Sequence, residues 1–296
     1  ITEEDKSGDG WFCSYPSECE YVKEEFFSGE IYTNYFANYQ NITKCGMKFL
    51  DKDADGVYDP DVDEPLGGVE IELWSMQGDF NPERILQTTF TDDETGEYCF
   101  DVRPGKYLVT ENTTALAEMG YIQSYPNEMT GGMAKNFSDY DRGWGWKVDL
   151  LSGEEELDND FGNYQAATKC GYKLNVTDAG DMPVEGWWIY LYKDGETEPE
   201  QSLQTGSDGG YCFEGLEPGE VYFVCEGMES GWQQVDKAGY DYHCCDNFDP
   251  GLPSEGWRFA PASGQVEEFN NFTNVKNATK CGYKINADTG EGIPNW

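Results

Sequence analysis

Short segments in which apolar and polar residues alternate recur along the chain, separated by turns rich in Gly, Asp, Asn and Pro. In one of them Val69, Ile71 and Leu73 alternate with Glu70 and Glu72. Successive side chains of a strand point to opposite faces, so this pattern predicts half-buried β-strands. Further strands are expected at 45–50, 97–102, 106–111, 145–151 and 160–164, and only 113–119 suits one or two helical turns.

The pattern returns because the sequence repeats. FANYQNITKCGMK at 36–48 comes back as FGNYQAATKCGYK at 161–173 and as FTNVKNATKCGYK at 272–284. The two complete periods, 45 to 170 and 170 to 281, are 125 and 111 residues long, which suits independently folded domains. We expect a window of a longer polypeptide, with the C-terminal part of a preceding repeat at 1–40, full repeats at 41–165 and 166–276, and the N-terminal strand of a following repeat at 277–296. The alternative is a two-domain protein with divergent terminal strands.

About seven short strands per period with Gly- and Asp-rich connections predict an all-β fold, a tandem array of two-sheet β-sandwiches. The expected core is aromatic and occupies equivalent positions in both repeats: Tyr98, Phe100, Tyr107 and Val109, and Tyr211, Phe213, Tyr222 and Val224. In the repeated string, FGNYQ reads as the last strand of one sandwich and TKCGYK as the first strand of the next.

Charge and composition exclude several function classes. The chain carries 19 basic and 58 acidic residues, a formal charge of −39, so phosphates would be repelled and nucleic acid is not a partner. No apolar run approaches the ~20 residues that span a bilayer, so we expect no membrane insertion. Six NxS/T acceptor sites exceed the chance number and predict a glycosylated, extracellular chain, with sites at Asn41, Asn112, Asn136, Asn175, Asn271 and Asn277.

Ten cysteines without a CxxC pair, and a single histidine, favour disulfides over zinc in a secreted chain. Each full repeat has one cysteine near its start and one in a GxYCF strand, which predicts Cys45–Cys99 and Cys170–Cys212. We also expect Cys13–Cys19, Cys225 with Cys244 or Cys245, and a partner for Cys281 beyond Trp296.

Three blocks of the first repeat carry a family resemblance. DKDADGVYDPDVDEPLGGVEIELW, TTFTDDETGEYCFDVRPGKYLVTEN and LDNDFGNY resemble, in order, the acidic loop, the GxYxF strand with its PGxY turn, and the closing strand of the B-type repeats of serine-aspartate-repeat surface adhesins and related prokaryotic cell-surface proteins. The second repeat is similar through GWWIYLYKDGE, GSDGGYCFEGLEPGEVYF and ESGWQQ. The resemblance implies a prealbumin-like or immunoglobulin-like sandwich used in series as a stalk or spacer. Cysteines and acceptor sites depart from that family's usual pattern.

The carboxylates of the acidic loop have the spacing of a calcium-binding loop. Asp51, Asp53, Asp55 and Asp59 stand at relative positions 1, 3, 5 and 9, with Gly56 at the bend and the Val57 carbonyl at position 7. The closing carboxylate would be Asp63 or Glu64. We predict structural Ca²⁺ there, against the alternative of a solvated acidic turn. The second repeat is shorter at this point and should lack the site.

A related adhesin family cross-links a first-strand lysine to a last-strand asparagine through a glutamate. Residues of these types occur here at Lys44 or Lys48, Glu111, and Asn159 or Asn163. Lysine and glutamate in strands usually lie on the surface, and a disulfide already ties the first strand, so the sequence favours no such bond.

No catalytic motif is present, and one histidine excludes repeated histidine-based triads, so we expect no enzyme. Aromatic pairs such as Trp187-Trp188 suggest a glycan platform, but neighbours in a strand face opposite sides. The sequence therefore predicts a non-enzymatic, extracellular cell-surface protein that forms a stalk, fibre, sheath or surface layer, with copies or neighbouring repeats of itself as partners. Alternatives are an adhesin or carbohydrate-binding module with surface glycans as partners, and an accessory array of a secreted hydrolase.

Overall fold

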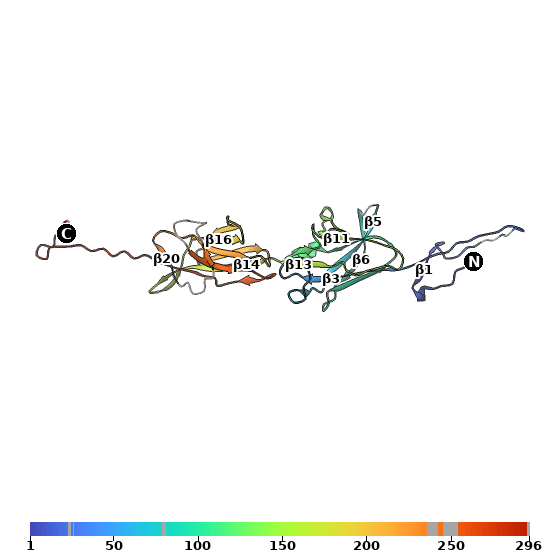
Figure 1. The fold of residues 1–296 in the computed structure, drawn as a ribbon, viewed down its shortest axis with the longest axis horizontal. Helices are drawn as coiled ribbons and strands as arrows, with labels where there is room; N and C mark the ends of the chain where they lie inside the picture. Colours follow the sequence, from blue (N-terminus) through green and yellow to red (C-terminus); the bar gives the residue numbers. More distant parts are fainter. Residues whose placement is uncertain (23–24, 26, 79–80, 236–241, 245–253, 295–296) are drawn as a thin grey trace. The chain divides into compact units, whose positions relative to one another are not determined.

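The computed structural model describes residues 1–22, 25, 27–78, 81–235, 242–244 and 254–294, and the regular secondary structure of these residues is almost entirely strand. The chain divides into two compact units (Figure 1). Unit 1 comprises Ile1–Ala167, Gly215–Gly219 and Pro261–Gln265; unit 2 comprises Thr168–Glu214, Glu220–Ala260 and Val266–Trp296. Within the described residues, no helix is both long and apolar enough to cross a membrane.

Two sheets make up the main body of unit 1. One has the strand order β10-β11-β8-β5-β6, and the other has β12-β3-β13-β9, with β4 and β7 also paired to β3. The elements are β3 Ile42–Leu50, β4 Glu64–Pro65, β5 Glu70–Gln77, β6 Asn81–Phe90, β7 Glu97–Val102, β8 Gly105–Glu111, α1 Thr113–Glu118, β9 Tyr121–Tyr125, β10 Ala134–Asn136, η2 Ser138–Tyr140, β11 Trp144–Leu150, β12 Glu155–Glu156 and β13 Phe161–Gln165.

The core of unit 1 lies between these sheets. Ile71, Val109 and Val148 from one sheet and Phe100 and Phe161 from the other belong to a single buried cluster. Because both inner faces contribute to it, unit 1 is a β-sandwich of the predicted class.

Unit 2 repeats this strand order. One sheet is β15-β14-β24-β20 with β18 and β23 paired to β14, and the other is β17-β16-β19-β22-β21. The strands are β14 Ala167–Thr177, β15 Gly180–Pro183, β16 Trp188–Lys193, β17 Gln201–Gln204, β18 Gly210–Leu216, β19 Tyr222–Glu226, β20 Trp232–Val235, β21 Tyr242–Cys244, β22 Ser254–Phe259, β23 Val266–Glu267 and β24 Phe272–Lys276.

First and last strands run parallel and side by side in each unit. β3 pairs with β13 so that Lys48 lies opposite Phe161, and β14 pairs with β24 so that Lys173 lies opposite Phe272. In both, the asparagine two residues after that phenylalanine, Asn163 or Asn274, enters the same ladder. β13 ends at Gln165 and β14 begins at Ala167, which places the strand boundary within the repeated string as expected.

The flanking segments carry little regular structure. β1 Trp11–Tyr15 pairs with β2 Ala37–Gln40 after the short helix η1 Ser7–Asp9. After Asn277, the described residues contain one isolated bridge between Ile285 and Gly292. The assignment of these segments to neighbouring repeats stays a prediction.

Three details differ from the sequence expectation. β6 was missed because its exposed side chains do not alternate in polarity. Tyr107 is only half-buried, and its hydroxyl donates to the Arg103 carbonyl 2.8 Å away. Glu72 was expected to face solvent but is buried, because Arg142 covers it with Nε 2.7 Å and Nη2 2.8 Å from its carboxylate oxygens.

Candidate functional site

The acidic loop between β3 and β4 brings three carboxylates together. Ligand oxygens of Asp51, Asp53 and Asp63 all lie within 4.8 Å of one another. Gly56 has φ +76°, so the bend uses a conformation that glycine adopts at little cost, and its amide donates to Asp51 Oδ2 at 2.9 Å. The loop thus aims hard oxygen ligands at one point.

Two properties of the cluster fit a cation. Asp51 is fully buried, and its Oδ1 has no hydrogen-bond partner in the part of the chain that the structure describes. Burial, together with the charges of Asp55, Asp63 and Asp51, raises the pKa of Asp53. A divalent cation would satisfy the buried oxygen and relieve this repulsion, which favours Ca²⁺ with its preference for carboxylate oxygens.

The remaining predicted ligands lie apart from this cluster. Asp55 and Asp59 are exposed and accept hydrogen bonds from the backbone N–H groups of Val57 and Asp61. Glu64 is exposed and pairs with Lys52. In unit 2, β14 turns back directly into β15 at Thr177–Gly180, so no comparable loop exists there.

A buried cluster links the first and last strands of unit 1. Lys48 on β3, Glu111 at the end of β8 and Asn163 on β13 are all inaccessible to solvent or nearly so. Lys48 Nζ donates to Asn163 Oδ1 and lies 3.3 Å from Glu111 Oε2, while Asn163 Nδ2 donates to Glu111 Oε1 at 3.0 Å. An amine, a carboxyl and a carboxamide therefore meet in a site without water access.

Burial shifts the amine and the carboxyl toward their neutral forms. It lowers the pKa of Lys48 against the opposing effect of Glu111, and it raises the pKa of Glu111 against the opposing effects of Lys48 and Asn163. A neutral amine is a nucleophile, and a neutral carboxyl beside it is a proton donor.

Unit 2 has the same constellation at the same strand positions. Lys173 Nζ on β14 lies 3.0 Å from Glu226 Oε2 at the end of β19. Asn274 on β24 supplies the carboxamide, whose Nδ2 donates to Met228 Sδ at 3.8 Å. The lysine, the glutamate and the asparagine are all buried. Burial raises the pKa of Glu226 to about 7 and lowers that of Lys173.

These clusters correct the sequence interpretation, which placed such residues on the surface. Sequence alone did not show that the outer ends of each repeat pair as parallel strands. The signal that could have revealed the clusters was the recurrence of lysine, glutamate and asparagine at equivalent positions of both repeats.

Four disulfides tie the described chain. The structure joins Cys45 to Cys99, Cys170 to Cys212, Cys13 to Cys19, and Cys225 to Cys244. The first three match the predicted pairs, and the fourth selects Cys244 over Cys245, which lies outside the described residues. Cys281 is free and exposed within the described chain.

The predicted glycosylation sites differ in accessibility. Asn136 and Asn277 are exposed, whereas Asn41, Asn112, Asn175 and Asn271 are half-buried. Asn112 caps α1, with its side chain accepting from the Ala115 amide and donating to Glu70. A glycan on this nitrogen would compete with the contact to Glu70.

Trp188 is the first residue of β16 and Trp187 directly precedes it, and the two side chains face opposite sides, as the strand period predicts. Trp187 is buried against Trp232, with ring centroids 5.3 Å apart. Trp188 is 45% exposed and stacks on Tyr190. Of the two tryptophans, it is Trp188 with its stacking partner that offers a surface to a ligand.

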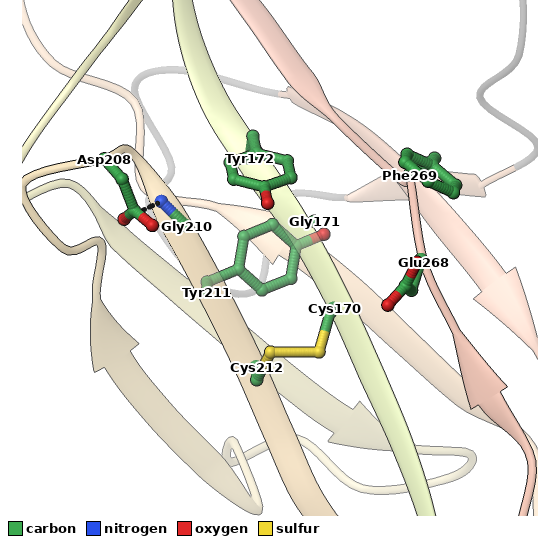
Figure 2. A pocket seen from close by; sticks show the side chains of 9 residues that line it. All are labelled: Cys170, Gly171, Tyr172, Asp208, Gly210, Tyr211, Cys212, Glu268 and Phe269. Carbon is green, nitrogen blue, oxygen red and sulfur yellow. Dashed lines mark hydrogen bonds between the residues drawn. A yellow bond between two sulfur atoms is a disulfide. The ribbon is translucent and has the colours of Figure 1, made fainter.

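A surface pocket of about 320 Å³ lies beside the Cys170–Cys212 disulfide (Figure 2). Its two carboxylates, Asp208 and Glu268, stand on opposite sides in this view, and Asp208 accepts a hydrogen bond from the Gly210 amide.

No protein-family model matches the chain, and no curated protein matches it with significance. Among solved structures, the minor pilin GBS52 of Streptococcus agalactiae is 13% identical over 82% of this chain and 99% of its own, with a TM-score of 0.30. The TIE protein of Bacillus anthracis is 16% identical over 83% of this chain and 36% of its own, with a TM-score of 0.31. The shaft pilin SpaA of Lactobacillus rhamnosus GG is 10% identical over 82% of this chain and 100% of its own, with a TM-score of 0.29. Likenesses at this level carry no conclusion about function, which we draw from the chain's own residues.

Proposed function

We propose that this chain is part of a non-enzymatic, extracellular structural protein of the cell surface, a tandem array of β-sandwich repeats that bears load in a stalk, fibre, sheath or surface layer. One observation carries the proposal: in both units, a buried Lys–Glu–Asn cluster connects the strand where the sandwich begins to the strand where it ends. Neighbouring repeats or further copies of the chain are the expected partners.

The position of the clusters suits a load-bearing role. Tension on a tandem array enters a unit at one end of its first strand and leaves from its last. In unit 1 these are β3 and β13, which are parallel neighbours, so tension shears them past one another. A covalent link between them would transmit force without unfolding the sandwich.

The chemistry for such a link is present in the buried cluster. The lone pair of Lys48 Nζ attacks Cγ of Asn163, the new Nζ–Cγ amide bond forms, and Nδ2 leaves as ammonia. The Glu111 carboxyl, in contact with both groups, relays a proton from Nζ to the departing nitrogen. We propose the same reaction for Lys173, Glu226 and Asn274. No oxidant or cofactor is consumed.

Intact mass spectrometry of the reduced chain tests this reaction. With both bonds formed, the chain is lighter than its sequence mass by two ammonia molecules from these sites, and a tryptic digest contains branched peptides at Lys48 and Lys173. Asn163→Ala and Asn274→Ala should each reduce the mass deficit by one ammonia molecule. Full sequence mass in the wild-type chain, with linear peptides at both lysines, contradicts the proposal.

Single-molecule stretching under reducing conditions tests the load-bearing role. The cross-link should hide the 115 residues between 48 and 163 from extension, roughly 400 Å at ~3.5 Å per residue. The double variant Asn159→Ala/Asn163→Ala, which leaves neither buried lysine of β3 a carboxamide partner, should release this length. If the wild-type chain extends as far as the variant, the bond does not carry load.

We further propose structural Ca²⁺ in the acidic loop of unit 1, supported by the convergence of Asp51, Asp53 and Asp63 and by the unpartnered Asp51 oxygen. N-glycosylation is proposed with Asn136 and Asn277 as the most accessible sites. The kinship with B-type repeats of serine-aspartate-repeat adhesins is also a proposal. It is supported by the order of the acidic loop, the GxYCF strand and the closing strand.

A second candidate function is recognition of surface glycans. The stacked, partly exposed pair Trp188 and Tyr190 favours it, because sugar rings bind flat on aromatic faces. A glycan array probed with the wild-type chain and with Trp188→Ala separates the two functions. Specific binding that the substitution abolishes supports the adhesin function. Absence of binding by the wild-type chain opposes it.

A further inference from the structure

Each unit contains a second buried lysine, four residues before the first on the same strand and the same face. In unit 2 this is Lys169 on β14, which lies opposite Glu267 of β23 in a parallel ladder. Lys169 Nζ is 2.7 Å from Glu267 Oε1 and donates to Asn270 Oδ1 at 2.5 Å. The three side chains again combine an amine, a carboxyl and a carboxamide.

The counterpart in unit 1 has the same residue types at the same positions, although Lys44 Nζ donates to the backbone carbonyls of Cys45 and Glu156, each at 3.4 Å. Lys44 on β3 lies opposite Glu156 of β12. Lys44 Nζ is 3.6 Å from Glu156 Oε1, and Asn159 Nδ2 donates to that same oxygen at 2.9 Å. In both units the asparagine follows the glutamate by three residues, just before the last strand.

The asparagines are fixed by contacts that also recur. The hydroxyl of Tyr98 donates to the backbone carbonyl of Asn159, and that of Tyr211 donates to the carbonyl of Asn270, each at 2.6 Å. These tyrosines lie on the strands that pair with the lysine strands. The backbone at both asparagines is therefore anchored to the core.

These lysines are not ordinary surface cations. Both are fully buried, and Lys169 Nζ lies 4.3 Å from the centroid of the Phe259 ring. In unit 1 the carboxamide oxygen Asn159 Oδ1 is buried and has no hydrogen-bond partner among the described residues. Holding a lysine ammonium out of water costs free energy, and a neutral amide link between the lysine and the asparagine would remove that buried charge.

We propose that Lys169 and Asn270 form a second isopeptide bond in unit 2, and Lys44 and Asn159 its counterpart in unit 1. The reaction rests on the same chemistry as the proposed function but uses different residues. Nζ of the lysine bonds to Cγ of the asparagine, the Cγ–Nδ2 bond breaks, and Nδ2 leaves as ammonia. The carboxyl of Glu267 or Glu156 carries the proton from Nζ to the leaving nitrogen.

Two cross-links would give each unit a doubly fastened first strand. Lys173 ties the middle of β14 to the last strand, and Lys169 ties the part nearer its start to the segment just before that strand. The strand then resists shear at two points, and loss of one bond does not free it.

Intact mass counts the bonds. The full 296-residue chain is produced in a host without N-glycosylation, then reduced and denatured. Four lost ammonia molecules, with branched peptides joining residues 169 to 270 and 44 to 159, are the expected result. Two lost ammonia molecules, with branching only at Lys48 and Lys173, overturn this inference and leave the proposed function standing. A chain of full sequence mass overturns both.

A pair of variants in unit 2 locates the bond. Asn270→Ala should reduce the loss to three ammonia molecules, while the Lys173–Asn274 peptide and the Cys170–Cys212 disulfide show that unit 2 still folds. The matched control is Asn271→Asp, because unit 1 has Asp160 at that position with the same contact to a strand amide. It should keep all four losses. If the Asn270→Ala chain still loses four ammonia molecules, the assignment of the bond to Asn270 is wrong.

Discussion

Two kinds of buried charge occur among the residues of this protein. Glu72 meets the guanidinium of Arg142 through two short hydrogen bonds, a pairing that satisfies both groups and contains no reactive carbon. Lys48 instead meets a carboxyl and a carboxamide, whose Cγ an amine attacks. Composition does not distinguish these cases, and the third partner decides between structural and reactive chemistry.

Glu226 should make the stability of an unlinked unit 2 depend on pH. In Asn274→Ala the bond cannot form, so the buried carboxyl keeps a folded-state pKa near the value of about 7 that burial gives it, against about 4.5 in the unfolded chain. Between these two pH values the folded state binds more protons than the unfolded state. The free energy of unfolding therefore falls as pH rises, by up to ~1.4 kcal/mol per pH unit. Urea unfolding at pH 5 and pH 7 measures the effect.

The control for this titration is the double variant Asn274→Ala/Glu226→Gln, in which the unfolding free energy should no longer fall between pH 5 and pH 7. Any dependence that Lys173 contributes has the opposite sign, because burial lowers its folded pKa and stability then rises with pH. A decline that persists in the double variant contradicts the assignment to Glu226.

Asp51 should control the response of unit 1 to calcium. With Ca²⁺ at 100 times its dissociation constant, the folded state should gain ~2.7 kcal/mol, and Asp51→Asn should remove most of this gain. The matched control is Asp61→Asn, an exposed carboxylate of the same loop outside the cluster. Isothermal calorimetry and thermal unfolding measure both. Equal responses from the two variants would show nonspecific attraction to an acidic loop.

Strand β16 offers a test of the two-faced pattern at the scale of an element. Trp187→Ala should destabilise unit 2 by about 3 to 5 kcal/mol, because it empties a core site against Trp232. Trp188→Ala, the adjacent control on the exposed face, should change the unfolding free energy by less than ~1 kcal/mol. Denaturant unfolding gives both values, and similar losses would mean that both faces of β16 are covered.

Strands with a clear alternation of apolar and polar residues could be predicted from the sequence. Features that depend on pairing between segments far apart in the chain could not. The predicted strand at 97–102 coincides with β7, and the turn expected at 113–119 is α1. β6 was not predicted, because an exposed strand on the edge of a sheet does not require alternating apolar and polar residues. Lys48 and Asn163 could be named as candidates, but their burial follows from the parallel pairing of β3 with β13, which no local pattern encodes.

At the scale of the whole molecule, two sandwiches of the same strand order differ in the loop that follows the opening strand. β3 leads into the acidic loop 51–63, whereas β14 turns straight back into β15. The core, the disulfide between first strand and GxYCF strand, and the Lys–Glu–Asn cluster are common to both. Calcium should therefore act on one unit and the cross-links on both.

Calorimetry of the full chain should accordingly resolve two unfolding transitions. Calcium should raise only one, assigned to unit 1, and Asp51→Asn should abolish that shift. Asn270→Ala/Asn274→Ala should lower only the other, because it leaves open a covalent loop of about 100 residues whose closure stabilises by ~4 to 5 kcal/mol in the chain-entropy model. Asn159→Ala/Asn163→Ala should lower the calcium-sensitive transition instead. A single transition that moves in all variants would mean that the two units unfold together, and the array would then act as one cooperative body instead of independent repeats.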